Sequence, residues 1–243
     1  MTAQRSDMDE PRVTILQQEP AAGPALLGDL LGEARLRVDV RRLDHGDEVP
    51  TEPAGLDALI VLGGDMNVGE EADYPFLRAE QRLLSQAVRR GLPTLGICLG
   101  AQLLAAAAGG GVERRAEPVL GWRPIVVHRD DDLIAGIDRE TLLFQWRQYA
   151  CRLPGEAVLI ASGDGDPQIF RAGDAAWGVQ FHPEVTIEVL ASWVADDPQT
   201  VARCASGGGA GLLEESRRRL PASSALCRRL VTNFLAAAGL TSP

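Results

Sequence analysis

The sequence contains no lysine, because all 24 of its basic residues are arginines. This absence excludes a Walker-type phosphate-binding lysine, a Schiff base to pyridoxal phosphate and a Ser–Lys dyad. Cysteine is sparse too, and its four residues form no C-x-x-C pair, so neither a structural zinc site nor a secreted disulfide framework is expected. Histidine occurs only at His45, His128 and His182. A nucleophile that needs a histidine base therefore has three candidates.

An excess of basic charge and a long apolar run are missing as well. The formal net charge is −10, which argues against binding to the phosphate backbone of nucleic acids. No apolar run approaches the ~20 residues that a membrane-spanning helix needs, and the polar N-terminus does not resemble a signal peptide. We therefore expect a cytoplasmic protein that binds neither nucleic acid nor membrane.

Length and composition are those of a globular protein. The 243 residues are 45% hydrophobic and 24% charged, which permits a sizeable core in one large domain or two small ones. We expect residues 1–10 to form a disordered tail. Residues 11–243 are expected to form a single domain that ends in a helical segment.

The first half alternates between short apolar runs and helical periodicity. Residues 56–62 are almost continuously apolar and end in Gly63-Gly64, as expected for a central parallel strand buried on both faces. Strand-like and helix-like segments then alternate at lengths that indicate a three-layer α/β fold with a mostly parallel sheet. The predicted strands are 12–16, 36–40, 56–62 and 94–97, and the predicted helices are 25–31, 74–90 and 101–108.

The second half is richer in short strands separated by turns. This pattern predicts an antiparallel edge on the same sheet, followed by a helix from about residue 187 and a helical segment over about 212–238. The three glycines at 207–209 are typical of a flexible joint before that last segment. The predicted strands are 123–128, 142–146, 158–162, 168–171 and 175–181.

The segment Gly96-Ile97-Cys98-Leu99-Gly100 lies where a predicted strand turns into a helix. In so sharp a turn the glycines relieve steric clashes, and the side chain between them projects from the top of the sheet. The positive end of the following helix favours a thiolate at Cys98, and the amide of Leu99 is free to donate to a developing oxyanion. Cys98 is therefore a candidate nucleophile, and the alternative is a buried structural cysteine beside a tight turn.

A cysteine nucleophile needs a base, and His182 is the favoured candidate. It lies in the segment GVQFHPE (178–184), at the end of a predicted strand, where active sites of open α/β sheets form. Glu184 is placed to accept a hydrogen bond from the distal ring nitrogen and to orient the imidazole. Taken alone, this segment is also compatible with a polar turn. His45 lies in a polar turn and His128 ends a strand before an acidic run, so both are weaker candidates.

Two glycine clusters follow predicted elements and have different interpretations. Gly63-Gly64, after the 56–62 strand, permits positive φ and leaves an amide pointing outward, which makes it a candidate second oxyanion donor. The glycines at 109–111 are typical of an ordinary helix terminator.

Three segments in this order and spacing resemble motifs of the class I, triad-type, glutamine amidotransferases. The similarity is strongest to the stand-alone branch that is similar to the glutaminase domain of GMP synthase, and it extends over about residues 13–234. The segments are VLGGDMNV (61–68), PTLGICLGAQLL (93–104) and GVQFHPE (178–184). The resemblance implies a flavodoxin-like α/β fold.

The resemblance also implies a role for each matched residue, with no metal and no organic cofactor. The implied catalytic triad is Cys98 as nucleophile, His182 as general base and then acid, and Glu184 as orienting acid. The implied oxyanion donors are the backbone amides of Gly64 and Leu99. The implied substrate-binding residues are Gln102, whose side chain would hold glutamine, and Gly63, Met66, Arg147 and Gln148.

Three positions depart from the pattern of the family. A W-H-G-D-like stretch aligns with WRQY (146–149), so Arg147 replaces the usual histidine, and the E-x-G stretch appears as VLG (119–121). Asp65 stands where proline is common. Arg147 is either a surface arginine or a charge-assisted contact for a carboxylate of a different γ-glutamyl compound.

The resemblance implies hydrolysis of the γ-carboxamide of glutamine through a γ-glutamyl thioester on Cys98, with release of ammonia. The chain contains neither a P-loop nor a GxGxxG motif, so a separate synthetase would be needed as a partner to use the ammonia. One alternative is a stand-alone γ-glutamyl hydrolase or peptidase that acts on a γ-glutamyl amide or conjugate. Another is a catalytically silent binding protein that retains the fold.

Overall fold

The computed structural model describes residues 11–34 and 36–240, so the predicted tail at 1–10 lies outside the described residues. The strands are β1 (Arg12–Gln17), β2 (Arg37–Arg42), β3 (Ala58–Val61), β4 (Thr94–Ile97), β5 (Gly111–Val127), β6 (Glu140–Arg152), β7 (Val158–Gly163), β8 (Asp166–Ala172) and β9 (Ala176–Val179). The helices are α1 (Ala25–Glu33), α2 (Phe76–Arg90), α3 (Leu99–Ala107), α4 (Ile187–Asp196), α5 (Pro198–Cys204) and α6 (Gly208–Ala237). Short 3₁₀ turns lie at Leu43–His45 and Asp132–Ile134.

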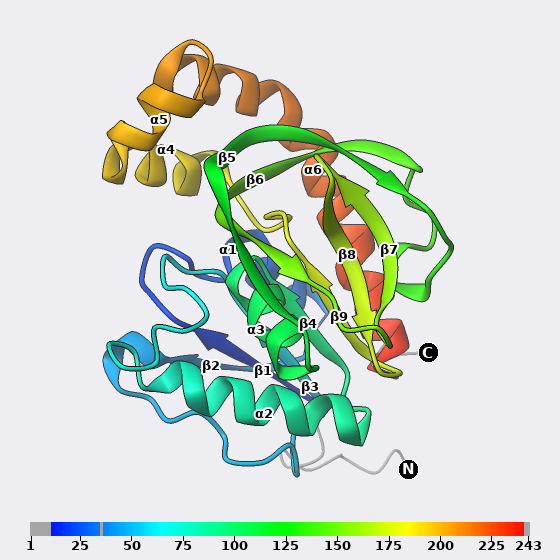
Figure 1. Ribbon diagram of the computed structural model, residues 1–243. Helices are drawn as coiled ribbons and strands as arrows, with labels where there is room; N and C mark the ends of the chain where they lie inside the picture. The colour runs from blue at the N-terminus through cyan, green and yellow to red at the C-terminus, as the bar shows by residue number, and fades with distance from the viewer. Residues whose placement is uncertain (1–10, 35, 241–243) are drawn as a thin grey trace.

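These strands form one twisted sheet in the order β2-β1-β3-β4-β9-β8-β7-β5-β6 (Figure 1). The pairs from β2 through to β9 are parallel, and the pairs from β9 through to β6 are antiparallel. β3, β4 and β9 are buried along their whole length, which explains their continuous apolar sequence. The prediction of an α/β fold with a parallel sheet and an antiparallel edge is confirmed.

The strands of the antiparallel part are longer than predicted. β5 has 17 residues and β6 has 13, and they pair from Gly111↔Arg152 to Val126↔Glu140 with one register shift between Arg114 and Val119. The short strands predicted at 123–128 and 142–146 are therefore wrong in length. Residues 113–117 (ERRAE) are mostly exposed, so this part of the hairpin carries no apolar periodicity that reveals a strand.

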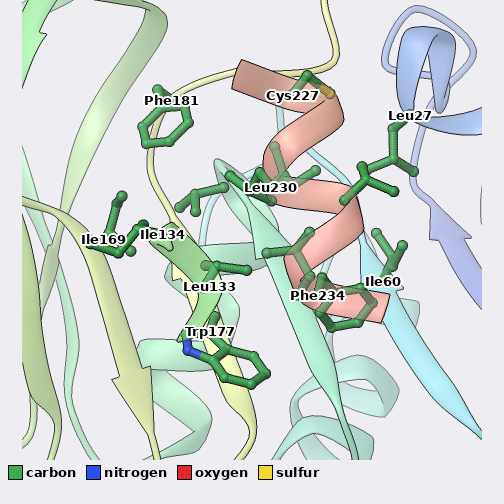
Figure 2. Close-up of a cluster of buried hydrophobic side chains, with 14 of the residues drawn as sticks. Leu27, Ile60, Leu133, Ile134, Ile169, Trp177, Phe181, Cys227, Leu230 and Phe234 are labelled. Carbon is green, nitrogen blue, oxygen red and sulfur yellow. The ribbon is translucent and has the colours of Figure 1, made fainter. Parts of the chain in front are cut away.

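Helices cover both faces of the parallel sheet. Ile60 of β3 belongs to the core beneath α1 and α6, whereas Leu59 and Val61 of the same strand belong to the core beneath α2 and α3. Figure 2 shows the first of these cores, where Leu230 and Phe234 of α6 point toward the strands and the Phe234 ring meets Trp177 edge-on at 6.3 Å. Among the described helices, none is both long and apolar enough to cross a membrane.

The glycines at 207–209 lie at the start of a helix instead of in a flexible joint. Gly207 adopts φ +80° as the N-cap of α6, and Gly208 and Gly209 begin the helix itself. A Cβ on Gly209 would lie 2.6 Å from Cγ1 of Val194, so a larger residue there would force the side chain of α4 to shift. In Figure 1, α6 first runs across the top of the molecule and then descends along the sheet. Pro221 inside the helix explains this bend, because proline removes a helical hydrogen bond.

Candidate active site

The turn between β4 and α3 is strained at Cys98. This residue has φ +50° and ψ −104°, a conformation that non-glycine residues rarely adopt. A Cβ on Gly96 would lie 2.5 Å from the Gly100 carbonyl oxygen, and a Cβ on Gly100 would lie 2.1 Å from the Val61 carbonyl oxygen. The two glycines are therefore required by close backbone contacts, and the turn holds Cys98 at the carboxyl edge of the parallel sheet.

His182 and Glu184 lie in the loop after β9, the strand next to β4. Nδ1 of His182 is 2.8 Å from Oε1 of Glu184, and the two residues are 4% and 3% exposed. The backbone N–H of His182 donates to the Phe144 carbonyl at 2.8 Å, which ties this loop to β6. The structure thus brings the predicted cysteine, histidine and glutamate together.

The surroundings of His182 favour the charged form of its imidazole. Burial lowers its pKa, but the charges of Cys98 and Glu184 and the hydrogen bonds to both raise the pKa of His182 well above its usual value. The Trp193 indole packs edge-on against the ring at 4.9 Å and restricts its orientation.

The other two histidines lie elsewhere on the surface. His45 is 62% exposed at its side chain and contacts Asp44, and His128 is exposed and lies 2.6 Å from the Ser162 hydroxyl. Neither lines a cavity that contains Cys98. Among the residues that the structure describes, no group of three or more His, Cys, Asp or Glu side chains is arranged to hold a metal ion.

Two cavities meet at Cys98. Their shared wall consists of Gly64, Asp65, Cys98, Trp146 and Asp197. The first, called here the His182-side cavity, is also lined by Glu19, Ala21, Ala22, His182, Trp193 and Asp196. The second, the Gln102-side cavity, is also lined by Met66, Asn67, Gln102, Pro118, Arg147, Gln148, Tyr149 and Thr200.

The predicted binding residues gather around the Gln102-side cavity, with one exception. Met66, Gln102, Arg147 and Gln148 line it, whereas Gly63 lies behind the triad, where a Cβ would be 3.1 Å from Cε1 of His182.

The two residues predicted to supply oxyanion donors lie side by side. Gly64 lines both cavities, and a Cβ at this position would lie 3.2 Å from Cδ2 of Leu99. Leu99 is the first residue of α3, so its amide has no acceptor within the helix.

Arg147 is a buried residue, so the interpretation as a surface arginine is wrong. Its side chain is 1% exposed, and Nη2 donates to the Asp166 carboxylate at 2.7 Å. Nε donates to Oε1 of Gln145 at 3.0 Å, and Arg115 forms a second ion pair with Asp166. Burial requires a partner for the guanidinium, and no sequence pattern indicated which carboxylate that is. Arg147 pairs with Val119 across the β5–β6 ladder, so two of the departures from the family pattern are neighbours.

Sequence reasoning missed the acidic wall of the His182-side cavity. Glu19 lies in the loop after β1, Asp196 is the last residue of α4, and Asp197 lies between α4 and α5. Burial and the neighbouring Asp65 raise the pKa of Glu19 to about 7, and loss of hydration with Asp197 and Asp196 nearby raises the pKa of Asp65. The one available signal was that Glu19 follows a strand ending at the edge that carries Cys98.

A cysteine on a tight strand-to-helix turn, at the carboxyl edge of a parallel sheet and beside a buried His–Glu pair, is the arrangement of a cysteine-dependent amidohydrolase, and this chain is an enzyme of that class. Residues 25–196 match the family model "Glutamine amidotransferase class-I", and the chain belongs to this family. The prediction from the three motifs is confirmed at this level.

Similar proteins carry related descriptions. The chain is 32% identical over 168 residues to YfeJ of Salmonella typhimurium, a glutamine amidotransferase-like protein, covering 66% of this chain and 70% of that one. It is 37% identical over 131 residues to the GMP synthase of Thermus thermophilus, covering 53% of this chain but only 24% of that enzyme. A crystal structure of a glutamine amidotransferase from Thermotoga maritima superposes with a TM-score of 0.84 at 25% identity, covering 93% of this chain and 98% of that one.

Proposed function

We propose that the protein hydrolyses the γ-carboxamide of glutamine and supplies the ammonia to a separate synthetase. The observation that carries this proposal is the buried His182–Glu184 pair beside the strained Cys98, with a cavity on either side of the sulfur. The GMP synthases to which the chain is similar are glutamine-hydrolysing enzymes by name, and the chain spans about a quarter of their length.

The proposed reaction begins with attack of the Cys98 thiolate on the γ-carbonyl carbon. The amides of Gly64 and Leu99 donate to the oxyanion, and the His182 imidazolium gives its proton to the departing nitrogen, so that ammonia leaves. His182, now neutral, takes a proton from water, which attacks the γ-glutamyl thioester. Glutamate leaves and the thiolate returns. The glutamyl part occupies the Gln102-side cavity, and the nitrogen leaves on the side that His182 lines.

The first test is ammonia release from glutamine by the wild type, Cys98→Ala and Cys204→Ala. Cys204 is a free, half-exposed cysteine outside both cavities, so it controls for loss of a thiol elsewhere. Ammonia release that vanishes only in Cys98→Ala supports the proposal. Equal release by all three variants contradicts it.

A second candidate function is hydrolysis of a γ-glutamyl amide whose leaving group is a cationic amine. The His182-side cavity, into which that group would leave, is lined by Glu19, Asp65, Asp196 and Asp197 and by no arginine. The indoles of Trp146 and Trp193 meet edge-on at 6.0 Å in the same wall, and aromatic faces attract ammonium groups. This arrangement favours an amine that keeps a positive charge.

Two substrates of equal length separate the candidates. The γ-glutamyl amide of 1,4-diaminobutane carries a terminal ammonium, and the γ-glutamyl amide of n-butylamine does not. If the second candidate is correct, kcat/KM for the diamine derivative exceeds that for the butylamide by roughly tenfold, and Asp65→Asn reduces the ratio. Equal values for the two amides, or activity on glutamine alone, exclude this candidate.

A further inference from the structure

The carboxyl group of Glu80 is buried in α2 and has no role in the reaction described above. Glu80 and Gln18 are both 0% exposed, and Nε2 of Gln18 donates to Oε1 of Glu80 at 2.8 Å. Oε2 of Glu80 and Oε1 of Gln18 have no hydrogen-bond partner among the described residues. A carboxylate buried with one neutral donor and no cation is strongly disfavoured.

A proton on Oε2 of Glu80 would provide a hydrogen-bond partner for both unpartnered oxygens. Burial raises the pKa of Glu80 to about 8, although the hydrogen bond from Gln18 lowers it somewhat, and no charged group contributes. A protonated carboxyl group has an O–H that can donate, and the unpartnered Oε1 of Gln18 is an acceptor on the side chain that already bonds Glu80. A protonated Glu80 would thus be able to donate to the same amide group from which it accepts.

The pair lies directly behind the candidate oxyanion hole. Gln18 follows the end of β1, and a Cβ on Gly64 would lie 3.4 Å from Cβ of Gln18. The next residue, Glu19, lines the His182-side cavity, and its carbonyl accepts a hydrogen bond from Nε2 of Gln17 at 2.9 Å. The connection from β1 to α1 is thus tied to α2 at the residue that packs against Gly64.

We propose that Gln18 and Glu80 form a neutral acid–amide pair that holds this connection against Gly64 and so positions the Gly64 amide for the oxyanion. The inference rests on the proposed function, since it assigns Gly64 as an oxyanion donor. Glu80 and Gln18 are positioning residues, because neither lines a cavity at Cys98. Small displacements of an oxyanion donor lower kcat more than substrate affinity.

The test compares Glu80→Leu, Glu80→Gln and Leu84→Ala in the ammonia-release assay. Glu80→Leu removes the partner of Gln18 and is expected to lower kcat roughly tenfold or more, with KM within about twofold. Glu80→Gln forms an amide–amide pair with the same two hydrogen bonds and is expected to restore kcat to within about threefold of the wild type. Leu84, fully buried on the same helix, controls for lost packing. Leu84→Ala should have an unchanged kcat at temperatures where the variant is still folded.

Two results would overturn the inference. If Glu80→Leu lowers kcat no more than Leu84→Ala, the pair acts only on stability. If Glu80→Gln is as slow as Glu80→Leu, the reaction needs the carboxylate and not a neutral pair.

A spectroscopic measurement keeps the inference apart from the proposed function. The infrared difference spectrum of wild type minus Glu80→Gln at pH 7 should contain the C=O stretch of a protonated carboxylic acid, and a carboxylate band in its place refutes the neutral pair. If the wild type releases no ammonia from any γ-glutamyl amide, the proposed function fails and the positioning role fails with it. The infrared band still decides the protonation of Glu80 in that case.

Discussion

Close backbone contacts around Cys98 leave no room for a side chain at Gly96 or Gly100. Gly100 packs against the Val61 carbonyl of β3, and Gly96 packs against the Gly100 carbonyl. The strained turn at Cys98 therefore depends on the neighbouring strand β3 as well as on residues 96–100. The glycines were visible in the sequence. The neighbouring strand that makes Gly100 necessary was visible only after folding.

Gly100→Ala should destabilise the protein by about 3 kcal/mol or more, because its Cβ would lie 2.1 Å from a backbone oxygen that cannot move freely. Urea unfolding measures the change. Gly32→Ala is the matched control, since Gly32 is an exposed residue of α1 with nothing within 4 Å, and this change should stabilise the protein by ~0.5–1 kcal/mol. Similar values for the two variants would refute the steric argument.

Asp166→Asn should destabilise the protein by about 3 kcal/mol, because it leaves the buried guanidinium of Arg147 without its carboxylate. Asp130→Asn removes the partner of Arg139 at a side chain that is 93% exposed, and its effect should stay within ~0.5 kcal/mol. Thermal unfolding at pH 7 compares the two. A small effect of Asp166→Asn would mean that the ion pair with Asp166 is not what holds Arg147 in the interior.

Among the elements, α6 connects the sheet with the α4–α5 layer. Its second half fills the core beneath α1 with Leu230, Val231 and Phe234. Its first half packs Leu212 into a separate cluster with residues of β5, β6 and α4. The bend at Pro221 permits one helix to serve both places (Figure 1).

Phe234→Ala should lower the free energy of unfolding by about 3–5 kcal/mol, because the ring is 1% exposed and contacts Trp177. Thr232→Ala, two residues earlier on an exposed position of α6, should change it by less than ~0.5 kcal/mol. Chemical denaturation followed by tryptophan fluorescence reports both. A loss below about 1 kcal/mol for Phe234→Ala would indicate that α6 is not part of the cooperative core.

At the scale of the whole molecule, we expect the stability of the fold to depend on pH through carboxyl groups whose pKa is raised by folding. The pKa of Glu80 rises from 4.5 to about 8, so between these values the native state holds a proton that the unfolded state releases. Stability from this group is fully present below pH 4.5 and is lost as the pH rises toward 8. Glu19, with its pKa raised to about 7, acts in the same direction.

Glu80→Gln removes the proton uptake and should therefore be more stable than the wild type at pH 8 by a few kcal/mol, with little difference near pH 4.5. The difference should grow by at most ~1.4 kcal/mol per pH unit over this window. Urea unfolding at half-unit pH intervals measures it. A difference that is independent of pH would show that Glu80 ionises normally in the folded protein.

The sequence by itself determined the local features of this protein. Residues 56–62 indicated a buried parallel strand, residues 94–97 a short strand, the Gly-x-Cys-x-Gly turn an elbow, and the three motifs the family. Each depends on the preferences of neighbouring residues, which a short segment contains in full. The full length of the β5–β6 hairpin was not predicted, because its exposed part at 113–117 carries no apolar pattern.

Only the tertiary structure decided which distant groups become partners. It paired Arg147 with Asp166 and Gln18 with Glu80, and it assembled the acidic wall of the His182-side cavity from three separate segments. A sequence indicates that a charged side chain needs a partner if it is buried. Which partner it meets depends on how the strands are ordered and how the helices pack, and those are properties of the whole chain.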